Sequence, residues 1–226
     1  MRGMKPRREA TSICFFSPLV SFHFIFALRL PNNDITGGAP SFHLFKGFVI
    51  SPANLVTQSL LNVLCTMPRT SPQPRIVTVS SMGVTRTSHA ALPLPLRLFY
   101  GLLKVPHKDK AGMERIISHC AGWAFDHGEP GDEILGRDWV NREGLPAAGS
   151  LKRALVIRPA LLTDGECLAE SGSALSTEGQ RKEAYRVSEA DIRGWTISRK
   201  DVAHFVVDAV LHRWDQFENK CVSIVY

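Results

Sequence analysis

The chain lacks the cysteine and histidine patterns of metal-binding or disulfide-linked domains. Its five cysteines are scattered over 226 residues, and no two of them form a C-x-x-C pair. Neither a zinc knuckle nor a disulfide framework is indicated, so we expect a reducing, cytoplasmic compartment. The four histidines from His89 to His127 share no ligand spacing, and we therefore predict no metal site.

The chain has a long stretch without acidic residues: no Asp or Glu occurs between Asp34 and Asp109.

The net charge of the chain is +6. Residues 1–50 carry six basic and two acidic residues, whereas residues 51–226 carry 21 basic and 19 acidic residues. The body of the chain is therefore nearly balanced, which argues against a nucleic-acid-binding surface, and we predict no nucleic-acid partner.

The first 50 residues differ in composition from the rest and hold eight of the twelve phenylalanines. A basic start precedes an apolar run over residues 13–28, as in a signal or anchor segment. However, Pro18 and His23 interrupt the run, and it is shorter than the roughly 20 residues that a membrane-spanning helix needs. We interpret residues 1–50 as an irregular extension, with a membrane tether through residues 13–30 as the alternative.

The rest of the chain, residues 51–226, alternates helical and extended patterns. Apolar residues at helical spacing predict helices around residues 56–67, 113–120 and 202–210, the last opened by an S-x-x-D capping box at Ser198 and Asp201. Short β-branched or apolar runs predict buried strands at residues 75–80, 154–157 and 221–226. This order predicts an α/β domain with a partly parallel sheet and crossover helices.

In such a sheet, ligands bind outside the carboxyl ends of the strands. Two of the predicted strands end at residues 80–83 and 159–163. The segments 121–150 and 164–197 are polar and loop-like, and they lie where loops that cover a ligand would lie.

Four stretches of the sequence resemble one family in order and approximate spacing. They are Ile76–Val84 (IVTVSSMGV), Asp109–Glu114 (DKAGME), Val156–Leu162 (VIRPALL) and Ile197–Ala203 (ISRKDVA). Together they resemble the atypical short-chain dehydrogenase/reductase-like proteins, the NAD(P)H-binding group that includes nitrogen-metabolite-regulator-like proteins. The resemblance covers residues 75–226 and implies a Rossmann-like fold, NADP or NAD as cofactor, and reduction of a small carbonyl substrate.

The sequence departs from this family in one respect. The family begins with a strand, a G-x-x-G-x-x-G turn that cradles the cofactor's pyrophosphate, and a helix. This sequence has no such turn, since the pair Gly37-Gly38 follows the polar stretch Pro31–Asp34 and no apolar strand. We therefore expect that the first βαβ unit is missing or replaced, that residues 51–226 form the C-terminal part of the domain, and that dinucleotide binding is weakened.

The resemblance also implies catalytic residues. Reductases of this superfamily use a Tyr, a Lys four residues later, and a Ser at the preceding strand end. Ser80 or Ser81 fits the Ser position. Lys110 matches the family's helix start, although a proline stands four residues before it, whereas Tyr100 has a lysine at the expected spacing but lies in a proline-rich context. The candidate catalytic residues are therefore Ser81, Lys110 and Tyr100.

The candidate cofactor-binding residues are Ser80, Ser81, Lys110, Arg158 and Pro159, the last two from the strand end that resembles the family's "RP" motif. Each has a structural alternative: the serines could only shape the strand exit, and Lys110 could be a solvated helix residue. At the level of the protein, the alternative is a non-catalytic regulatory or interaction protein on the same fold. A sheet edge left open by the missing strands would favour self-association.

Overall fold

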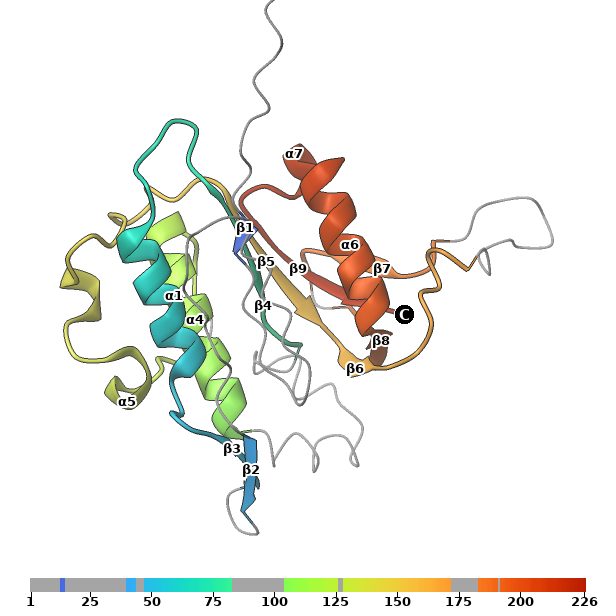
Figure 1. The fold of residues 1–226 in the computed structure, drawn as a ribbon, viewed down its shortest axis with the longest axis horizontal. Helices are drawn as coiled ribbons and strands as arrows, with labels where there is room; N and C mark the ends of the chain where they lie inside the picture. The colour runs from blue at the N-terminus through green and yellow to red at the C-terminus, as the bar shows by residue number, and fades with distance from the viewer. Residues whose placement is uncertain are drawn as a thin grey trace, which may run out of the picture.

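The computed structural model describes residues 13–14, 40–43, 47–82, 104–125, 128–171, 183–190 and 192–226. Its centre is a five-stranded sheet in the order β1-β4-β5-β9-β7 (Figure 1). The strands are β1 (Ile13–Cys14), β4 (Arg75–Val79), β5 (Ala154–Pro159), β9 (Lys220–Val225) and β7 (Arg186–Ser188). The first four are parallel to their neighbours, and β7 runs antiparallel to β9.

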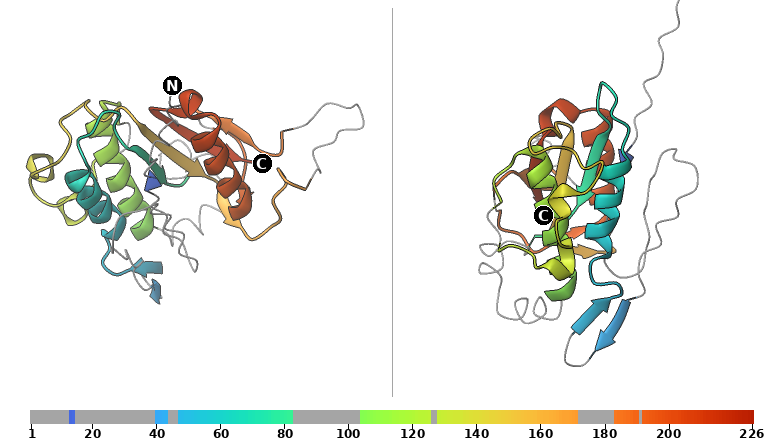
Figure 2. Two further views of the ribbon diagram at one scale, coloured as in Figure 1. Left: turned by 45° about the horizontal axis from the view of Figure 1, so that its top comes forward. Right: turned by 90° about the vertical axis from the view of Figure 1, so that its left-hand side faces the viewer.

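Helices cover both faces of this sheet. Helices α1 (Leu55–Thr66) and α4 (Lys104–Ala121) lie side by side on one face, and α6 (Arg199–Leu211) lies on the other (Figures 1 and 2). Alternation along the strands divides the core accordingly: Ile76 and Val156 pack with α1 and α4, whereas Val77 and Leu155 pack with α6. This arrangement of a mostly parallel sheet between two helix layers is Rossmann-like, as predicted.

Shorter elements complete the described part. The pair β2 (Pro40–His43) and β3 (Gly47–Ile50) is antiparallel, and the pair β6 (Leu161–Thr163) and β8 (Thr196–Ser198) is parallel. Helix α5 (Asp132–Leu135) and a 3₁₀ turn (Trp139–Asn141) lie within the segment expected to be a loop, and α7 (Trp214–Phe217) precedes β9. None of the described helices is long and apolar enough to cross a membrane.

The three predicted helices and three predicted strands are all present. The sequence analysis assigned no strand of the central sheet to residues 1–50, yet Ile13–Cys14 pairs with Arg75 and Ile76 of β4. Most of residues 1–50 lie outside the described residues, so their interpretation as an irregular extension stays a prediction, and so does the tether through residues 13–30.

The capping box at the start of α6 is confirmed and forms part of a larger junction. The Ser198 hydroxyl accepts a hydrogen bond from the Asp201 amide at 2.9 Å and donates one to the Asp201 carboxylate. That buried carboxylate also accepts hydrogen bonds from the Tyr226 hydroxyl at 2.5 Å and from the amides of Leu168 and Ala169. One side chain therefore joins the helix, the last strand and the loop after β6.

Burial alone would raise the pKa of Asp201. The hydrogen bonds from Tyr226, Ala169, Leu168 and Ser198 outweigh this effect and hold the pKa of that carboxyl below its ordinary value. The carboxylate therefore stabilises the fold at neutral pH.

We expect Asp201→Asn to lower the free energy of unfolding at pH 7 by roughly 3 kcal/mol, because an amide cannot accept all of these hydrogen bonds. The wild-type advantage should be complete above about pH 4 and shrink at lower pH, as protons bind to the carboxylate. Chemical denaturation at several pH values measures both effects. The exposed Asp215→Asn serves as control, and a loss equal in both variants would contradict the role of this junction.

Candidate functional site

The structure brings the two predicted strand ends together. The Ser80 amide donates a hydrogen bond to the Ile157 carbonyl at 2.7 Å, and the Met82 amide donates one to the Pro159 carbonyl at 2.9 Å. The parallel pairing of β4 and β5 therefore continues past the end of β4. Pro159 is buried at this edge, which is where parallel α/β sheets place their ligands.

Lys110 reaches this edge from α4. Its side chain is 1 % exposed, and its Nζ donates a hydrogen bond to the Ser80 carbonyl at 3.0 Å. Burial lowers the pKa of Lys110 to about 8, against the opposing effect of the Glu114 and Asp109 carboxylates, which favour the charged form. Lys110 is thus buried, so the alternative of a solvated helix residue is wrong, whereas its role in a cofactor or catalytic site stays a prediction.

Arg158 forms an ion pair beside Lys110. Its Nε lies 3.1 Å from Oε1 of Glu114, and a terminal guanidinium nitrogen lies 2.6 Å from Oε2. The Glu114 side chain is 3 % exposed and that of Arg158 is 18 % exposed. From the sequence, Glu114 stands out only through its spacing from Lys110. A signal was nevertheless present: on one helical face, the charged residues Lys110 and Glu114 interrupt an apolar stripe that includes Met113 and Ile117.

The two serines have different environments. Ser80 is fully buried, and its Oγ has no hydrogen-bond partner within the described part of the chain. Ser81 is nearly buried, and its Oγ donates a hydrogen bond to the Met82 carbonyl at 2.9 Å. Ser81 therefore shapes the turn after β4, while Ser80 Oγ retains unused hydrogen-bonding capacity. Tyr100 lies outside the described residues, and its catalytic role stays a prediction.

The position of Lys110 depends on a contact between α4 and α1. The Asp109 carboxylate accepts hydrogen bonds from the Val56 and Thr57 amides, each at 2.9 Å, in the first turn of α1. The Thr57 hydroxyl donates in return to the Asp109 carbonyl at 2.7 Å. Burial raises the pKa of Asp109, although these hydrogen bonds oppose the rise. Residue 109 is therefore fixed, and Lys110 follows it directly.

Gly112 allows the two helices to approach closely. A Cβ at this position would lie 2.5 Å from Thr57 Oγ1 and 2.5 Å from Ile134 Cγ2, below any normal contact distance. The absence of a side chain is what lets α4 pack against α1 at this depth.

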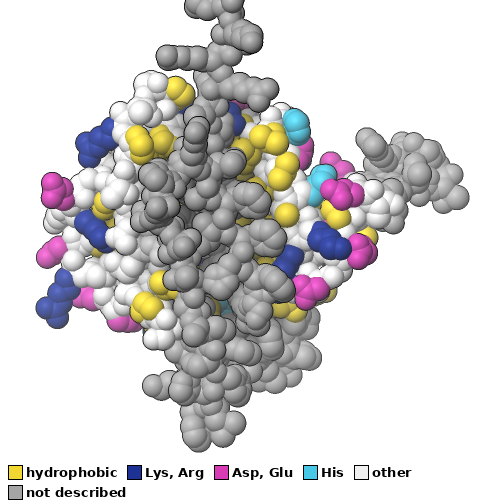
Figure 3. Space-filling model, in the orientation of Figure 1, with side chains coloured by type: hydrophobic (Ala, Val, Ile, Leu, Met, Phe, Trp, Pro, Cys, Tyr) yellow, Lys and Arg dark blue, Asp and Glu magenta, His cyan; other side chains and the backbone are white. Residues whose placement is uncertain are grey.

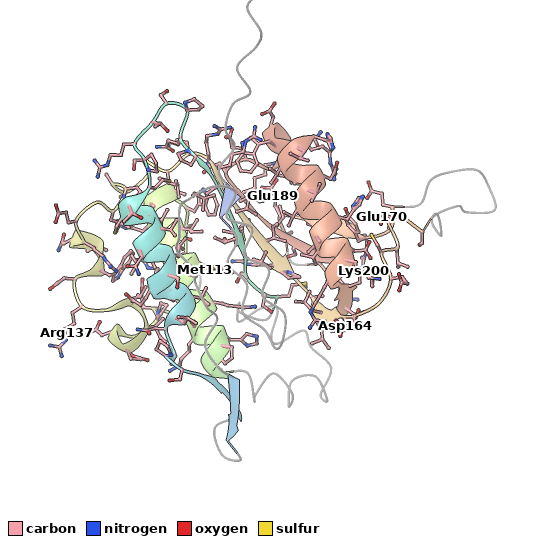
Figure 4. The ribbon with its side chains drawn as sticks, viewed as in Figure 1. Met113, Arg137, Asp164, Glu170, Glu189 and Lys200 are labelled. Carbon is pink, nitrogen blue, oxygen red and sulfur yellow. The ribbon has the colours of Figure 1, made fainter. Side chains whose placement is uncertain are left out.

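The loop after β6, which follows the end of β5, forms ion pairs with the start of α6. After β6, Asp164 pairs with Arg199 at 2.5 Å and Glu166 pairs with Lys200 at 2.8 Å. Figure 4 labels Asp164 and Lys200, one residue of each pair. Asp201 holds the loop's next residues, as described above. The loop after β6 is thus a fixed neighbour of the Pro159 strand end.

The charged groups outside this cluster form no competing centre. Among the described residues, no three His, Cys, Asp or Glu side chains are placed to hold a metal ion. On the face shown in Figure 3, the described Lys and Arg side chains alternate with Asp and Glu around the margin. The buried cluster of Lys110, Glu114 and Arg158 is therefore the chemically distinctive feature of the described part.

No family model matches the chain. A curated relative, the reductase pytE of Aspergillus terreus, is 31% identical over 159 residues, which cover 70% of this chain and 50% of that protein. The resemblance to atypical short-chain dehydrogenase/reductase-like proteins is confirmed. The chain spans about half the length of the curated relative that it matches.

The solved structures that the chain resembles are less similar to it in sequence. A short-chain dehydrogenase/reductase from Veillonella parvula in complex with NADP is 12% identical, with a TM-score of 0.39 over 78% of this chain and 58% of that one. ChuY, an anaerobilin reductase from Escherichia coli O157:H7, is 14% identical, with a TM-score of 0.40 over 84% and 60%.

We expect Gly112→Ala to destabilise the reductase-like domain by about 1–3 kcal/mol through overpacking. The clash should outweigh the gain of up to about 1 kcal/mol that alanine gives inside a helix. Denaturation of Gly112→Ala, Thr57→Ala and the double variant measures this. The double variant should lose less than the sum of the two single losses, whereas simple additivity would show that the helices do not meet at this point.

The lowered pKa of Lys110 predicts a pH-dependent stability. Between about pH 8 and the ordinary lysine pKa, the unfolded chain holds a proton that the folded chain has released, so stability should rise with pH. Over this interval the wild type should gain about 3 kcal/mol relative to Lys110→Met. Urea denaturation from pH 7 to pH 10 measures the difference. A flat difference would contradict the buried lysine.

Proposed function

We propose that this chain carries the nicotinamide side of an NADP- or NAD-dependent reductase site that acts on a small carbonyl substrate. The observation that carries the proposal is the buried Lys110 ammonium at the carboxyl end of β4, held against the Ser80 carbonyl. The reductase relative supports the same function over 70% of the chain.

The residues at the strand ends fit a sugar hydroxyl better than a phosphate. Lys110 Nζ supplies donors beyond the one that Ser80 uses, and Ser80 Oγ is a buried hydroxyl without a partner in the described part. Lys110 and Ser80 would hold the nicotinamide ribose, with Arg158 and Pro159 framing the neighbouring strand end. NADPH or NADH would supply the hydride.

We assign substrate orientation and proton delivery to the other two candidate residues, Ser81 and Tyr100. Ser81 would orient the substrate carbonyl, and Tyr100 would donate the proton, as the resemblance implies. A nearby ammonium lowers the pKa of a phenol, which is how Lys110 would assist Tyr100. These roles and a cytoplasmic location are part of the proposal.

The pyrophosphate side of the cofactor site has no counterpart in this sequence. The sequence contains no G-x-x-G-x-x-G turn, which in such folds brings backbone amides and a helix N-terminus close to the phosphates. We therefore infer weak dinucleotide binding by this chain. Self-association through the sheet edge also stays a prediction; β1 pairs with only two residues of β4.

We expect NADPH to bind this chain with a dissociation constant well above the low-micromolar range, and Lys110→Met to weaken that binding at least about tenfold by removing a charge-assisted hydrogen bond. Titration followed by NADPH fluorescence measures both. The matched control is Lys108→Met on the same helix, whose exposed side chain pairs with Glu133 and should leave binding unchanged.

Two outcomes would contradict the proposal. Equal losses in Lys110→Met and Lys108→Met would show that position 110 is not part of the site. Low-micromolar binding that does not depend on Lys110 would show that the cofactor is held elsewhere.

A further inference from the structure

Glu114 lies between two cations at the ligand-facing end of the sheet. It follows Lys110 by one helical turn on α4, and Arg158 reaches both of its carboxylate oxygens from β5. All three side chains are largely buried: Lys110 and Glu114 almost completely, and Arg158 to more than four fifths. The helix thus contacts the ends of both central strands, β4 through Lys110 and β5 through Glu114.

The charge of this cluster depends on Glu114. With both cations protonated, the single carboxylate offsets only one of them, and Asp109 is occupied by the amides of α1. Without Glu114, the buried Lys110 ammonium and the Arg158 guanidinium would both lose a nearby carboxylate, which is costly. Arginine does not release its proton, so the lysine would become neutral instead.

We propose that Glu114 is a positioning residue that keeps Lys110 in its ammonium form and directed at the end of β4, with Arg158 as the counter-charge that allows the carboxylate to be buried. This inference rests on the proposed function, because an ammonium is what a ribose-binding Lys110 requires. Glu114 and Arg158 are 44 positions apart in the sequence, so their ion pair forms only in the folded domain.

The other groups that face Lys110 do not replace Glu114. Asp109 and His107 lie on the same helix, and Ser80 of β4 contributes a carbonyl. From β5 the charged group among the described residues is Arg158, which pairs with Glu114, and α1 contains no charged residue. Among the described carboxylates, Glu114 therefore contributes most to the charge state of Lys110.

The test measures, without any ligand, how much Lys110 contributes to the free energy of unfolding. The free energy of unfolding is measured from pH 6 to pH 10 for chains with Lys110 and with Lys110→Met, in the wild-type and Glu114→Gln backgrounds. The difference between each pair begins to rise at the pKa of Lys110 in the folded chain. We expect this onset to move down by at least about one pH unit in Glu114→Gln.

A matched control is available on the outer side of α4. Arg115 Nε donates to both carboxylate oxygens of Glu129, at 2.8 and 3.0 Å, but the Glu129 side chain is largely exposed. Glu129→Gln should leave the onset unchanged. Glu114→Asp keeps the charge and should hold the onset close to that of the wild type.

A second variant tests the same idea with the opposite sign. In Arg158→Gln, Glu114 loses its guanidinium partner and interacts more strongly with Lys110, so the onset should move to higher pH; this arm remains informative if Glu114→Gln does not fold. A uniform loss of stability with no shift of the onset in any variant would overturn the proposal. If the onset shifts as expected but the wild-type chain shows no NADPH binding, the proposed function fails and the positioning role of Glu114 stands.

Discussion

The hydrogen bond from the Lys110 ammonium to the Ser80 carbonyl connects the helix layer to the edge of the sheet where a ligand would lie. Burying an ammonium is expensive unless charges and hydrogen bonds compensate it. That cost explains why the Glu114 carboxylate lies one helical turn from Lys110, and why α4 must sit close enough for a lysine side chain to reach the strand end. The remaining features of the site follow from this requirement.

The depth of α4 is set by its contact with α1. Asp109 completes the first turn of α1 by accepting two of its free amides, and Gly112 removes the side chain that would separate the helices. An amide donor at a helix start is unsatisfied without such a partner. The same contact therefore satisfies α1 and fixes the residue directly before Lys110.

Two buried aspartates perform similar tasks on the two faces, yet their pKa values move in opposite directions. Asp109 has hydrogen bonds from Thr57 and the amide of Val56, and burial prevails, so its pKa is raised. Asp201 has two hydroxyl donors and two amide donors, and these prevail over burial, so its pKa is lowered. The balance between burial, which raises the pKa, and the donors, which lower it, decides whether a buried carboxylate stabilises the fold at neutral pH.

The sequence predicted those features that rest on local patterns. The β-branched run at 75–80 and the capping box at Ser198 each signal an element through neighbours in the chain, and both are present. Strands β1 and β7 were missed because they have two and three residues, too few for a periodic signal. Helix α5 was missed because its four residues lie in a polar, glycine-rich segment.

The site shows the same limit. The family resemblance pointed to Lys110 and Arg158, but the partner of Arg158 could not be read, because Glu114 is 44 positions away and the pairing depends on how α4 crosses β5. Likewise, the capping box gave Asp201 its local partner Ser198, but not Tyr226 or the loop amides. Charged residues on an apolar helical face were the available signal, since burial then demands partners.

The lysine site is organised independently of any phosphate contact. Glu114 pairs with Arg158, and the Ser80 carbonyl already aligns the Lys110 amine, so ligand binding would cost little further side-chain entropy here. A ribose would meet a prearranged group, whereas a pyrophosphate would meet no glycine turn. Under the proposed function, affinity and orientation are therefore separable: Lys110 and Ser80 would orient a nicotinamide ribose, while the sequence has no glycine-rich turn to bind the phosphates.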